Sequence, residues 1–236
     1  MTRDRARVRA RTHTLHPVAL APLHVVVPIR TLVGGKARLG GALDAEEREG
    51  LVLGMLRRTL AVLAAWPPAD RILVVSPDAD LLARVAGPEV ATLVQPGSGL
   101  NAGLLLARAD ALATGARALL VLPGDLPLLA EAALDRLLEA ADAALAAGSG
   151  RPLVVIGPSD ARQGTHALLL APPAIIDPAF GAGSCEAHIR AAAVAGASVQ
   201  LVTEPALGFD LDTPEDLELL EPPRLAALMA LGRDGA

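Results

Sequence analysis

Short apolar runs that alternate with longer segments of helical character constrain the fold of this chain more than any other feature. Each run is followed by helix signals, such as Asp44 as an N-cap before 45–65. In the third such helix, Leu105, Ala109 and Leu112 recur at a spacing that predicts a core-facing side. Runs of this kind are typical of strands buried on both faces of a parallel sheet. The alternation predicts an α/β protein, a Rossmann-like three-layer fold with a mostly parallel central sheet. The four runs are residues 23–29, 71–76, 90–94 and 118–122.

The pattern is looser after Gly150, but it still indicates one domain. No internal repeat or long linker divides the chain, so residues 21–236 are expected to form a single domain. Residues 1–20 are basic and aperiodic, which predicts a disordered arm. After Gly150, three further strands are expected at 152–156, 166–170 and 199–202, together with a helix at about 185–196 and a C-terminal helix.

Composition excludes several classes of partner. The net charge is −5 and the isoelectric point is about 5.5, which argues against a general nucleic-acid binder. Cys185 is the one cysteine, so no internal disulfide can form, and this fits a reducing cytosol. No apolar run is long enough to span a membrane. We therefore expect a cytoplasmic protein that binds neither nucleic acid nor membrane.

The loop after the first apolar run carries the chain's only lysine, Lys36, and has the composition of a phosphate-binding loop. Gly34 and Gly35 precede Lys36, and Arg38 follows it two residues later. The loop is not a P-loop, because Arg30 occupies the position of that motif's first Gly. The structural alternative is a Gly-rich turn with solvated charges. A single lysine in an Arg-rich chain favours a functional role.

Open α/β sheets bind ligands beyond the carboxyl ends of their strands, where two more groups are expected. Asp125 follows the fourth apolar run directly, and Gly99 and Asn101 open the helix after the third. The alternative for Asp125 is a loop carboxylate that is satisfied by nearby backbone amides. Its place at the end of a central strand favours the ligand-binding interpretation.

The segment Gly208–Leu217 predicts a metal site beside a helix start. Asp210 and Asp212 alternate with apolar residues, so both carboxylates point the same way. Two adjacent carboxylates repel each other unless a cation lies between them, and carboxylate oxygens suit Mg²⁺. Thr213 is expected to cap the following helix. Together with Asp125, the pair would form a magnesium site, in which not every carboxylate need be a direct ligand. The alternative is two loop residues beside a cap.

Two Gly-containing stretches have the character of anion pockets. One contains Thr165 and His166, and the other runs from Phe180 through Gly181 to Ser184. Backbone amides around glycines, together with hydroxyl groups, can hold a phosphate or a carboxylate. Ser184 is also a candidate N-cap of the next helix, and a helix N-terminus is itself an anion site. We expect His188, one turn further on, to be structural.

Taken together, six stretches resemble one family, the 2-phospho-L-lactate guanylyltransferases of the CofC/FbiD type. These belong to the nucleotide-diphospho-sugar transferase-like nucleotidyltransferases. The resemblance spans about residues 23–220. The stretches are VVVPIRTLVGGKARL, GSGLNAGL, LVLPGDLPLL, GTHALLL, FGAGSCEAH and GFDLDTPEDL.

The resemblance implies a step in the biosynthesis of coenzyme F-420. GTP and a three-carbon phospho-acid would give a guanylylated diphosphate and pyrophosphate. The acceptor would be 2-phospho-L-lactate, phosphoenolpyruvate or 3-phosphoglycerate. By position, Asp125, Asp210 and Asp212 would bind Mg²⁺; Thr165, Gly181 and Ser184 would hold the acceptor; and Lys36, Arg38, Gly99 and Asn101 would contact the nucleotide. His166 stands where many members have Asn, and Arg30 replaces a usual Lys.

Other functions fit the same residues. A different nucleotidyltransferase could use CTP with a sugar or isoprenoid phosphate, or a molybdopterin. Asp210 and Asp212 also mimic the D-x-D of metal-dependent sugar transferases. A regulator that binds a nucleotide without catalysis, or a purely structural domain, would leave the acidic groups or the Gly-containing loops unexplained. The apolar C-terminal segment could pack on its own body or on a partner, so a homodimer stays open.

Overall fold

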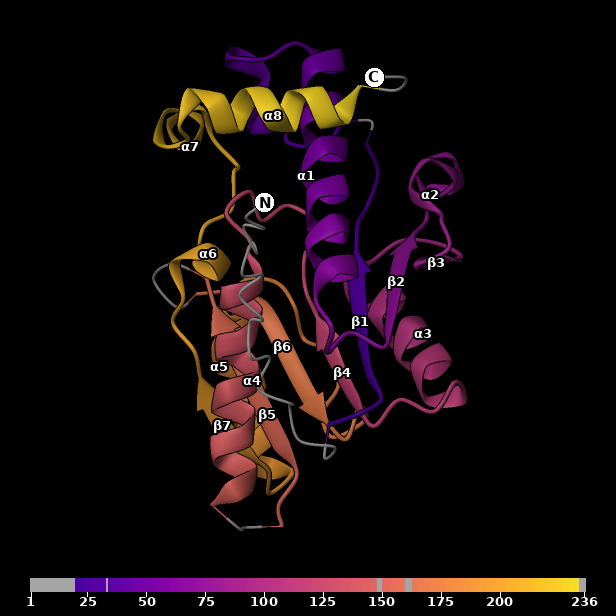
Figure 1. Cartoon of the computed structure of the whole chain (residues 1–236), viewed down its shortest axis with the longest axis vertical. Helices are drawn as coiled ribbons and strands as arrows, with labels where there is room; N and C mark the ends of the chain where they lie inside the picture. Colours follow the sequence, from indigo (N-terminus) through magenta and orange to yellow (C-terminus); the bar gives the residue numbers. More distant parts are fainter. Residues whose placement is uncertain (1–19, 33, 148–149, 160–162, 234–236) are drawn as a thin grey trace, which may run out of the picture.

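Strand β1 lies inside the sheet, between β2 and β4, and is buried along nearly its whole length. This computed structural model describes residues 20–32, 34–147, 150–159 and 163–233 (Figure 1). Of the predicted arm, residues 1–19 lie outside these ranges, whereas Leu20 is buried in the core. The strands are β1 (Leu23–Pro28), β2 (Arg71–Ser76), β3 (Val90–Val94), β4 (Ala118–Val121), β5 (Leu153–Pro158), β6 (Thr165–Ala171) and β7 (Ser198–Leu201).

The seven strands form one sheet in the order β3-β2-β1-β4-β6-β5-β7. β1 is parallel to β2 and β4, β2 is parallel to β3, and β5 is parallel to β7. β6 is antiparallel to both β4 and β5. The predicted mostly parallel α/β fold is therefore confirmed, with β6 as the reversed strand.

The strand order decides where a ligand can bind. After β1 the chain runs outward to β2 and β3, and it then returns to place β4 on the other side of β1. A crevice at such a reversal lies beyond the carboxyl ends of the two strands. Because β6 is antiparallel to β4, the first residues of β6 lie at this same edge. Loops that are far apart in the sequence therefore meet here.

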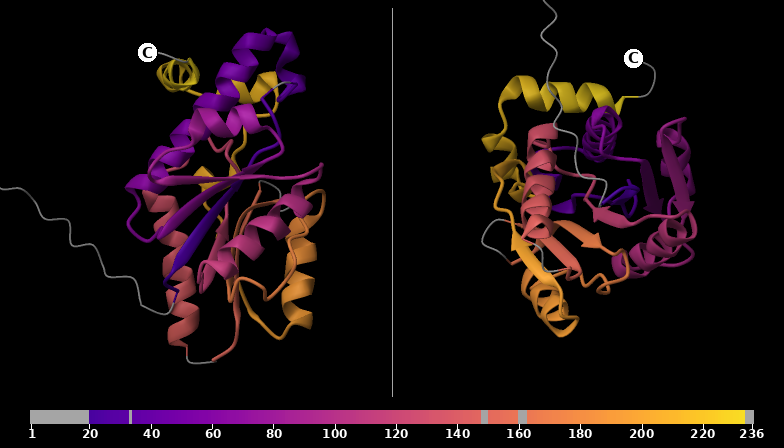
Figure 2. Two further views of the ribbon diagram at one scale, coloured as in Figure 1. Left: turned by 90° about the vertical axis from the view of Figure 1, so that its right-hand side faces the viewer. Right: turned by 60° about the horizontal axis from the view of Figure 1, so that its bottom comes forward.

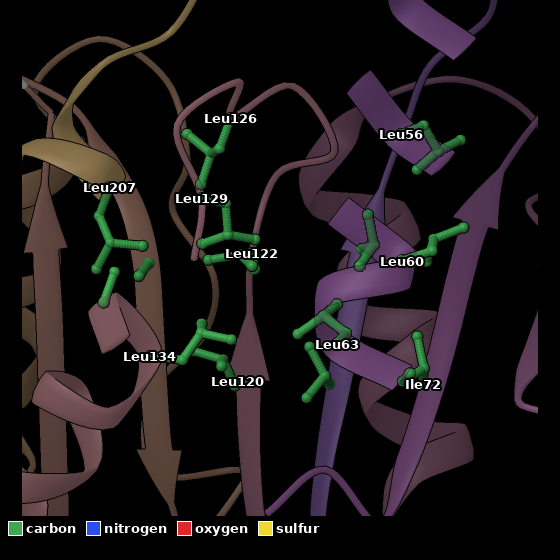
Figure 3. Packing of buried hydrophobic residues seen from close by; sticks show 14 of the residues in the cluster. Leu56, Leu60, Leu63, Ile72, Leu120, Leu122, Leu126, Leu129, Leu134 and Leu207 are labelled. Atoms are coloured by element: carbon green, nitrogen blue, oxygen red, sulfur yellow. The ribbon is translucent and has the colours of Figure 1, made fainter. Parts of the chain in front are cut away.

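Helices cover both faces of the sheet, as the two views of Figure 2 show. Alternate side chains of β1 belong to two separate cores: Val25 and Val27 pack with α1 and α4, whereas Val26 packs with α3 and α5. Figure 3 shows the first core, where Leu56, Leu60 and Leu63 of α1 face the sheet. The helices are η1 (Ala37–Gly41), α1 (Ala45–Ala65), α2 (Ala79–Val85), α3 (Leu100–Ala113), α4 (Glu131–Ala146), α5 (Ser184–Val194), α6 (Pro205–Gly208), α7 (Pro214–Leu219) and α8 (Pro222–Gly232).

The predicted core face of α3 is wrong. Leu105 is 40% exposed and Leu112 is 46% exposed, and the buried face is instead Gly103, Leu104, Ala107 and Ala111. Small residues on this face allow α3 to approach the sheet closely: a Cβ on Gly103 would lie 2.2 Å from the side-chain oxygen of Gln95. The larger leucines are left outside.

No helix in the described part of the chain is both long and apolar enough to cross a membrane. The C-terminal helix α8 packs instead on the body of its own chain, across α1 (Figure 1). Two glycines make this crossing very close. A Cβ on Gly54 would lie 1.9 Å from the carbonyl oxygen of Leu228, and one on Gly232 would lie 1.8 Å from that of Gly50. Neither position has room for a side chain.

We predict that Gly54→Ala destabilises the fold by about 2–3 kcal/mol, because the added methyl group forces α8 away from α1. Gly50→Ala, in the same helix, is the matched control, since a Cβ there meets nothing within 4 Å. It should leave stability unchanged or raise it by up to about 1 kcal/mol. Denaturant unfolding of both variants measures the difference. Equal stability of the two would contradict the close crossing.

Candidate active site

Lys36 lies between two carboxylates at the crevice beyond β1 and β4. Its Nζ donates hydrogen bonds of 2.6 Å to Asp125 Oδ2 and to Asp212 Oδ1. The side chain of Lys36 is only 9% exposed. The backbone of Lys36 is left-handed, with φ of 50°, which is rare for a residue with a side chain. The loop after β1 therefore turns sharply at the residue whose ammonium group enters the site.

Asp125 is placed by a tightly held turn after β4. A Cβ on Gly124 would lie 2.9 Å from Leu56 of α1, so the turn lies directly on that helix. Arg58, also on α1, donates to the carbonyl oxygens of Pro127 at 3.3 Å and Leu129 at 2.8 Å. No sequence motif marks Arg58 for this supporting role, so the role could not be predicted from the sequence.

Asp212 is placed by the predicted alternation and by the predicted helix cap. Leu211 is fully buried between the two aspartates, which are 41% and 42% exposed at their side chains. Asp216 accepts from the backbone N–H groups of Asp212 at 2.9 Å and Thr213 at 2.7 Å. The capping box at Thr213 is confirmed, and it also fixes the backbone that presents Asp212.

The electrostatics of the site follow from an excess of carboxylates. Burial alone would lower the pKa of Lys36, but Asp125 and Asp212 reverse this and raise the pKa above its usual value. Lys36 therefore stays charged. Burial raises the pKa of Asp210, and the nearby carboxylates of Asp212 and Asp125 add to the rise. His166 and Lys36 oppose that rise. Three carboxylates thus face one ammonium group.

The predicted metal site is not assembled as a cage of ligands. Among the described residues, no group of three or more His, Cys, Asp or Glu side chains is arranged to hold a metal ion. The ammonium group of Lys36 contacts Asp125 and Asp212 instead. Their oxygens are of the kind that Mg²⁺ prefers, so the donor chemistry fits while Lys36 competes for the same atoms. Magnesium stays a prediction.

His166 lies beside Asp210, where β6 begins. Its Nδ1 is 2.7 Å from the carbonyl oxygen of Leu207. A carbonyl oxygen only accepts, so Nδ1 carries the hydrogen, and Nε2 lies 3.9 Å from Asp210 Oδ2. The antiparallel direction of β6 thus brings a predicted substrate-binding residue next to a predicted metal ligand.

The two predicted anion pockets form one region. A Cβ on Gly164 would lie 4.0 Å from Ser184 Oγ, so the loop before Thr165 adjoins the start of α5. Thr165 is 5% exposed and Ser184 is 1% exposed. Gly181, with φ of 137°, bends the chain before the helix. The N-cap of α5 is Gly183 and Ser184 is the first helical residue, so the helix begins one residue earlier than predicted.

The side chain of Asn101 is hydrogen-bonded to the backbone of Phe180, in the stretch that precedes α5. Its amide oxygen accepts from Phe180 N at 2.8 Å, and its amide nitrogen donates to Phe180 O at 3.0 Å. Gly99, with φ of 110°, accepts at its carbonyl oxygen from the Gln95 side chain at 2.9 Å. Gly34 and Arg38 are exposed, and Gly35 is half-buried. Nucleotide contacts of these residues stay predictions.

His188 is buried, as a structural residue would be. Its Nδ1 lies 3.0 Å from Thr165 Oγ1, and its Nε2 accepts from Ala179 N at 2.9 Å. The Phe180 ring packs edge-on against it, with centroids 5.1 Å apart. Burial lowers the pKa of His188 from 6.5 to about 4.

Comparison with known proteins places the chain in a family. A family model described as "Guanylyl transferase CofC like" matches residues 23–221. The chain belongs to this family. The predicted resemblance and the predicted enzyme class, a guanylyl-transferring nucleotidyltransferase, are confirmed. Several relatives are named phosphoenolpyruvate guanylyltransferase. The one from Rubrobacter xylanophilus is 48% identical and covers 83% of this chain and 92% of its own. The one from Sphaerobacter thermophilus is 39% identical, covering 83% and 90%.

Solved structures show the same fold at low sequence identity. A putative nucleotide-diphospho-sugar transferase from Desulfovibrio desulfuricans matches with a TM-score of 0.70 and 18% identity, over 89% of this chain and 96% of its own. A nucleotidyl transferase from Methanothermobacter thermautotrophicus has a TM-score of 0.58 and 18% identity, covering 86% and 98%. The CofC-like chain therefore has the predicted nucleotide-diphospho-sugar transferase-like fold.

We predict that His188 makes the stability of this protein depend on pH. The folded pKa of about 4 lies below the unfolded value near 6.5, so between these values the unfolded state binds more protons. Stability should therefore fall as the pH is lowered from 6.5 to 4, by about 3 kcal/mol from this residue. His188→Gln removes this contribution, and groups shared by both proteins cancel in the comparison. Denaturant unfolding at pH 7 and pH 4.5 measures both slopes. Parallel losses in the two proteins would contradict the prediction.

Proposed function

We propose that this chain joins the guanylyl group of GTP to the phosphate of phosphoenolpyruvate and releases pyrophosphate, as a step in coenzyme F-420 biosynthesis. The observation that carries the proposal is the position of Lys36. A buried ammonium group and three carboxylates lie together at one edge of the sheet, and His166, next to Thr165 of the predicted anion pocket, lies beside one of these carboxylates. The name shared by the relatives described above supports phosphoenolpyruvate over 2-phospho-L-lactate and 3-phosphoglycerate.

The reaction needs positioning and charge neutralisation more than proton transfer. The acceptor's phosphate oxygen is already ionised at neutral pH, so it can attack without a general base. It forms a bond to the α-phosphorus of GTP, the bond from that phosphorus to the bridging oxygen breaks, and pyrophosphate leaves with the electron pair. Negative charge accumulates throughout, and Lys36 and Arg38 are the cations that the loop after β1 supplies.

Asp125 and Asp212, with Asp210 beside them, would hold Mg²⁺. The metal would act as a Lewis acid that neutralises charge on the phosphate oxygens. Lys36 contacts Asp125 and Asp212, and this keeps the two carboxylates close together despite their mutual repulsion. The chain would thus supply a preformed pair of carboxylates, which either the ammonium group of Lys36 or Mg²⁺ can contact.

The pocket of Thr165, Gly181 and Ser184 would hold the acceptor. Its hydroxyl groups and the backbone N–H groups at the start of α5 can donate to a carboxylate or a phosphate. His166 is next to Thr165 in the chain, its Nε2 lies 3.9 Å from Asp210 Oδ2, and it would contact the acceptor from the metal side. The acceptor would thereby be fixed at the carboxylate while its phosphate faces the nucleotide.

The test is pyrophosphate release from GTP and Mg²⁺ with phosphoenolpyruvate, 2-phospho-L-lactate and 3-phosphoglycerate in separate reactions, each repeated with CTP. We expect release with GTP and phosphoenolpyruvate. Asp212→Asn should lower turnover by about 100-fold or more, because a carboxylate that organises charge at the reacting phosphates is lost. Glu139→Gln, the same charge change on the exposed side of α4, should stay within about twofold. No release with any acceptor, or release only with CTP, would refute the proposal.

A further inference from the structure

His188 connects the two stretches that form the anion pocket. It lies on α5, one turn after Ser184, and its side chain is fully buried. One ring nitrogen contacts Thr165 at the start of β6, and the other accepts from Ala179 N. Ala179 directly precedes Phe180, which Asn101 holds from the other side. The ring therefore contacts both of the stretches that would form the acceptor pocket.

The hydrogen bond from Ala179 decides where the ring carries its proton. A backbone N–H can only donate, so Nε2 of His188 must accept with its lone pair. A neutral imidazole then carries its hydrogen on Nδ1, which lies 3.0 Å from Thr165 Oγ1. The lowered pKa of His188, about 4, keeps the ring neutral at physiological pH. His188 therefore donates to the hydroxyl group of Thr165.

This direction determines what Thr165 can do. A hydroxyl group has one hydrogen, and Thr165 accepts from His188, so its own hydrogen is available to another acceptor. In the part of the chain that the structure describes, His188 is the only partner recorded for this hydroxyl. In the opposite tautomer, the Nε2–H group of His188 and the N–H group of Ala179 would be two donors that point at each other. That tautomer would also make Thr165 donate to the ring, leaving a lone pair toward the ligand, which repels anions.

We propose that His188 is a positioning residue that fixes the hydroxyl of Thr165 as a hydrogen-bond donor to the anionic group of the phospho-carboxylate acceptor. The same ring fixes the backbone at Ala179, which leads to Gly181 and the start of α5. The inference deepens the proposed function, on which it rests. With Thr165 fixed in this way, the groups that face the acceptor here are hydrogen-bond donors. This favours carboxylate or phosphate oxygens over neutral hydroxyl or amine groups.

The kinetic test uses two variants that each keep one half of the ring's hydrogen bonding. His188→Asn keeps a donor near the Nδ1 position, toward Thr165. His188→Gln keeps an acceptor near the Nε2 position, toward Ala179. His188→Gln should raise the KM for phosphoenolpyruvate about tenfold or more, because a hydrogen bond to an ionised group loses its orientation. Its KM for GTP should stay within about twofold. His188→Asn should restore most of the affinity for phosphoenolpyruvate.

A structural role alone would give a different result. It would raise both KM values together, or lower the melting temperature without separating the two variants, and either outcome would overturn the proposal. Thr165→Val supplies the second check, since it removes the hydroxyl itself. In that background, His188→Gln should add less than about twofold to the KM for phosphoenolpyruvate. Additive effects of the two substitutions would also overturn it.

The tautomer can be tested without any turnover. In protein labelled with ¹⁵N-histidine, Nδ1 of His188 should have the chemical shift of a protonated nitrogen, and Nε2 that of an unprotonated one, from pH 8 to pH 5.5. A hydrogen on Nε2, or a charged ring at pH 6, would overturn the inference whatever the enzyme's substrate. Wild-type protein that shows the predicted tautomer but releases no pyrophosphate would instead refute the proposed function.

Discussion

The contact of Lys36 with two carboxylates is the interaction on which the rest of the site depends. It joins residues that are 89 and 176 positions apart in the chain. A buried ammonium group is costly unless it is paired, and two adjacent carboxylates repel each other unless a cation lies between them. Each partner therefore needs the others. The sheet order brings Lys36 and Asp125 together, because Lys36 follows β1 and Asp125 follows the neighbouring β4, and the segment before α7 adds Asp212.

Much of this arrangement could be predicted from the sequence. The apolar runs identified every strand, and the period-two pattern correctly placed Leu211 in the core with Asp210 and Asp212 facing outward. The direction of β6 could not be predicted, because an apolar run has the same composition whichever way it runs. That reversal is what brings Thr165 to the crevice. Local patterns indicate which face a side chain occupies, but not which distant group it contacts.

The predictions that failed have a common physical cause. On α3 the larger leucines suggested the buried face, whereas the small face around Gly103 is buried because the side chains of Gln95 and Val75 fill the space beside it. At α5 the hydroxyl of Ser184 suggested an N-cap, whereas Gly183, with φ of 71°, takes that place. The expectation that His188 is structural was correct, but its two polar contacts could not be predicted, because they form only where α5 lies beside β6. Each depends on close packing between distant elements.

Competition between Lys36 and the metal is tested most directly by the affinity of the nucleotide-free protein for Mn²⁺, used in place of Mg²⁺ and measured by electron paramagnetic resonance. If Lys36 competes with the metal for Asp125 and Asp212, Lys36→Met should bind Mn²⁺ at least about tenfold more tightly than the wild type, since removing a charge at contact distance is worth 1.4 kcal/mol or more. Arg38→Met, which removes an exposed cation from the same loop, should change the affinity by less than about threefold. Unchanged or weaker binding by Lys36→Met would contradict the claim that Lys36 and the metal share one pair of carboxylates.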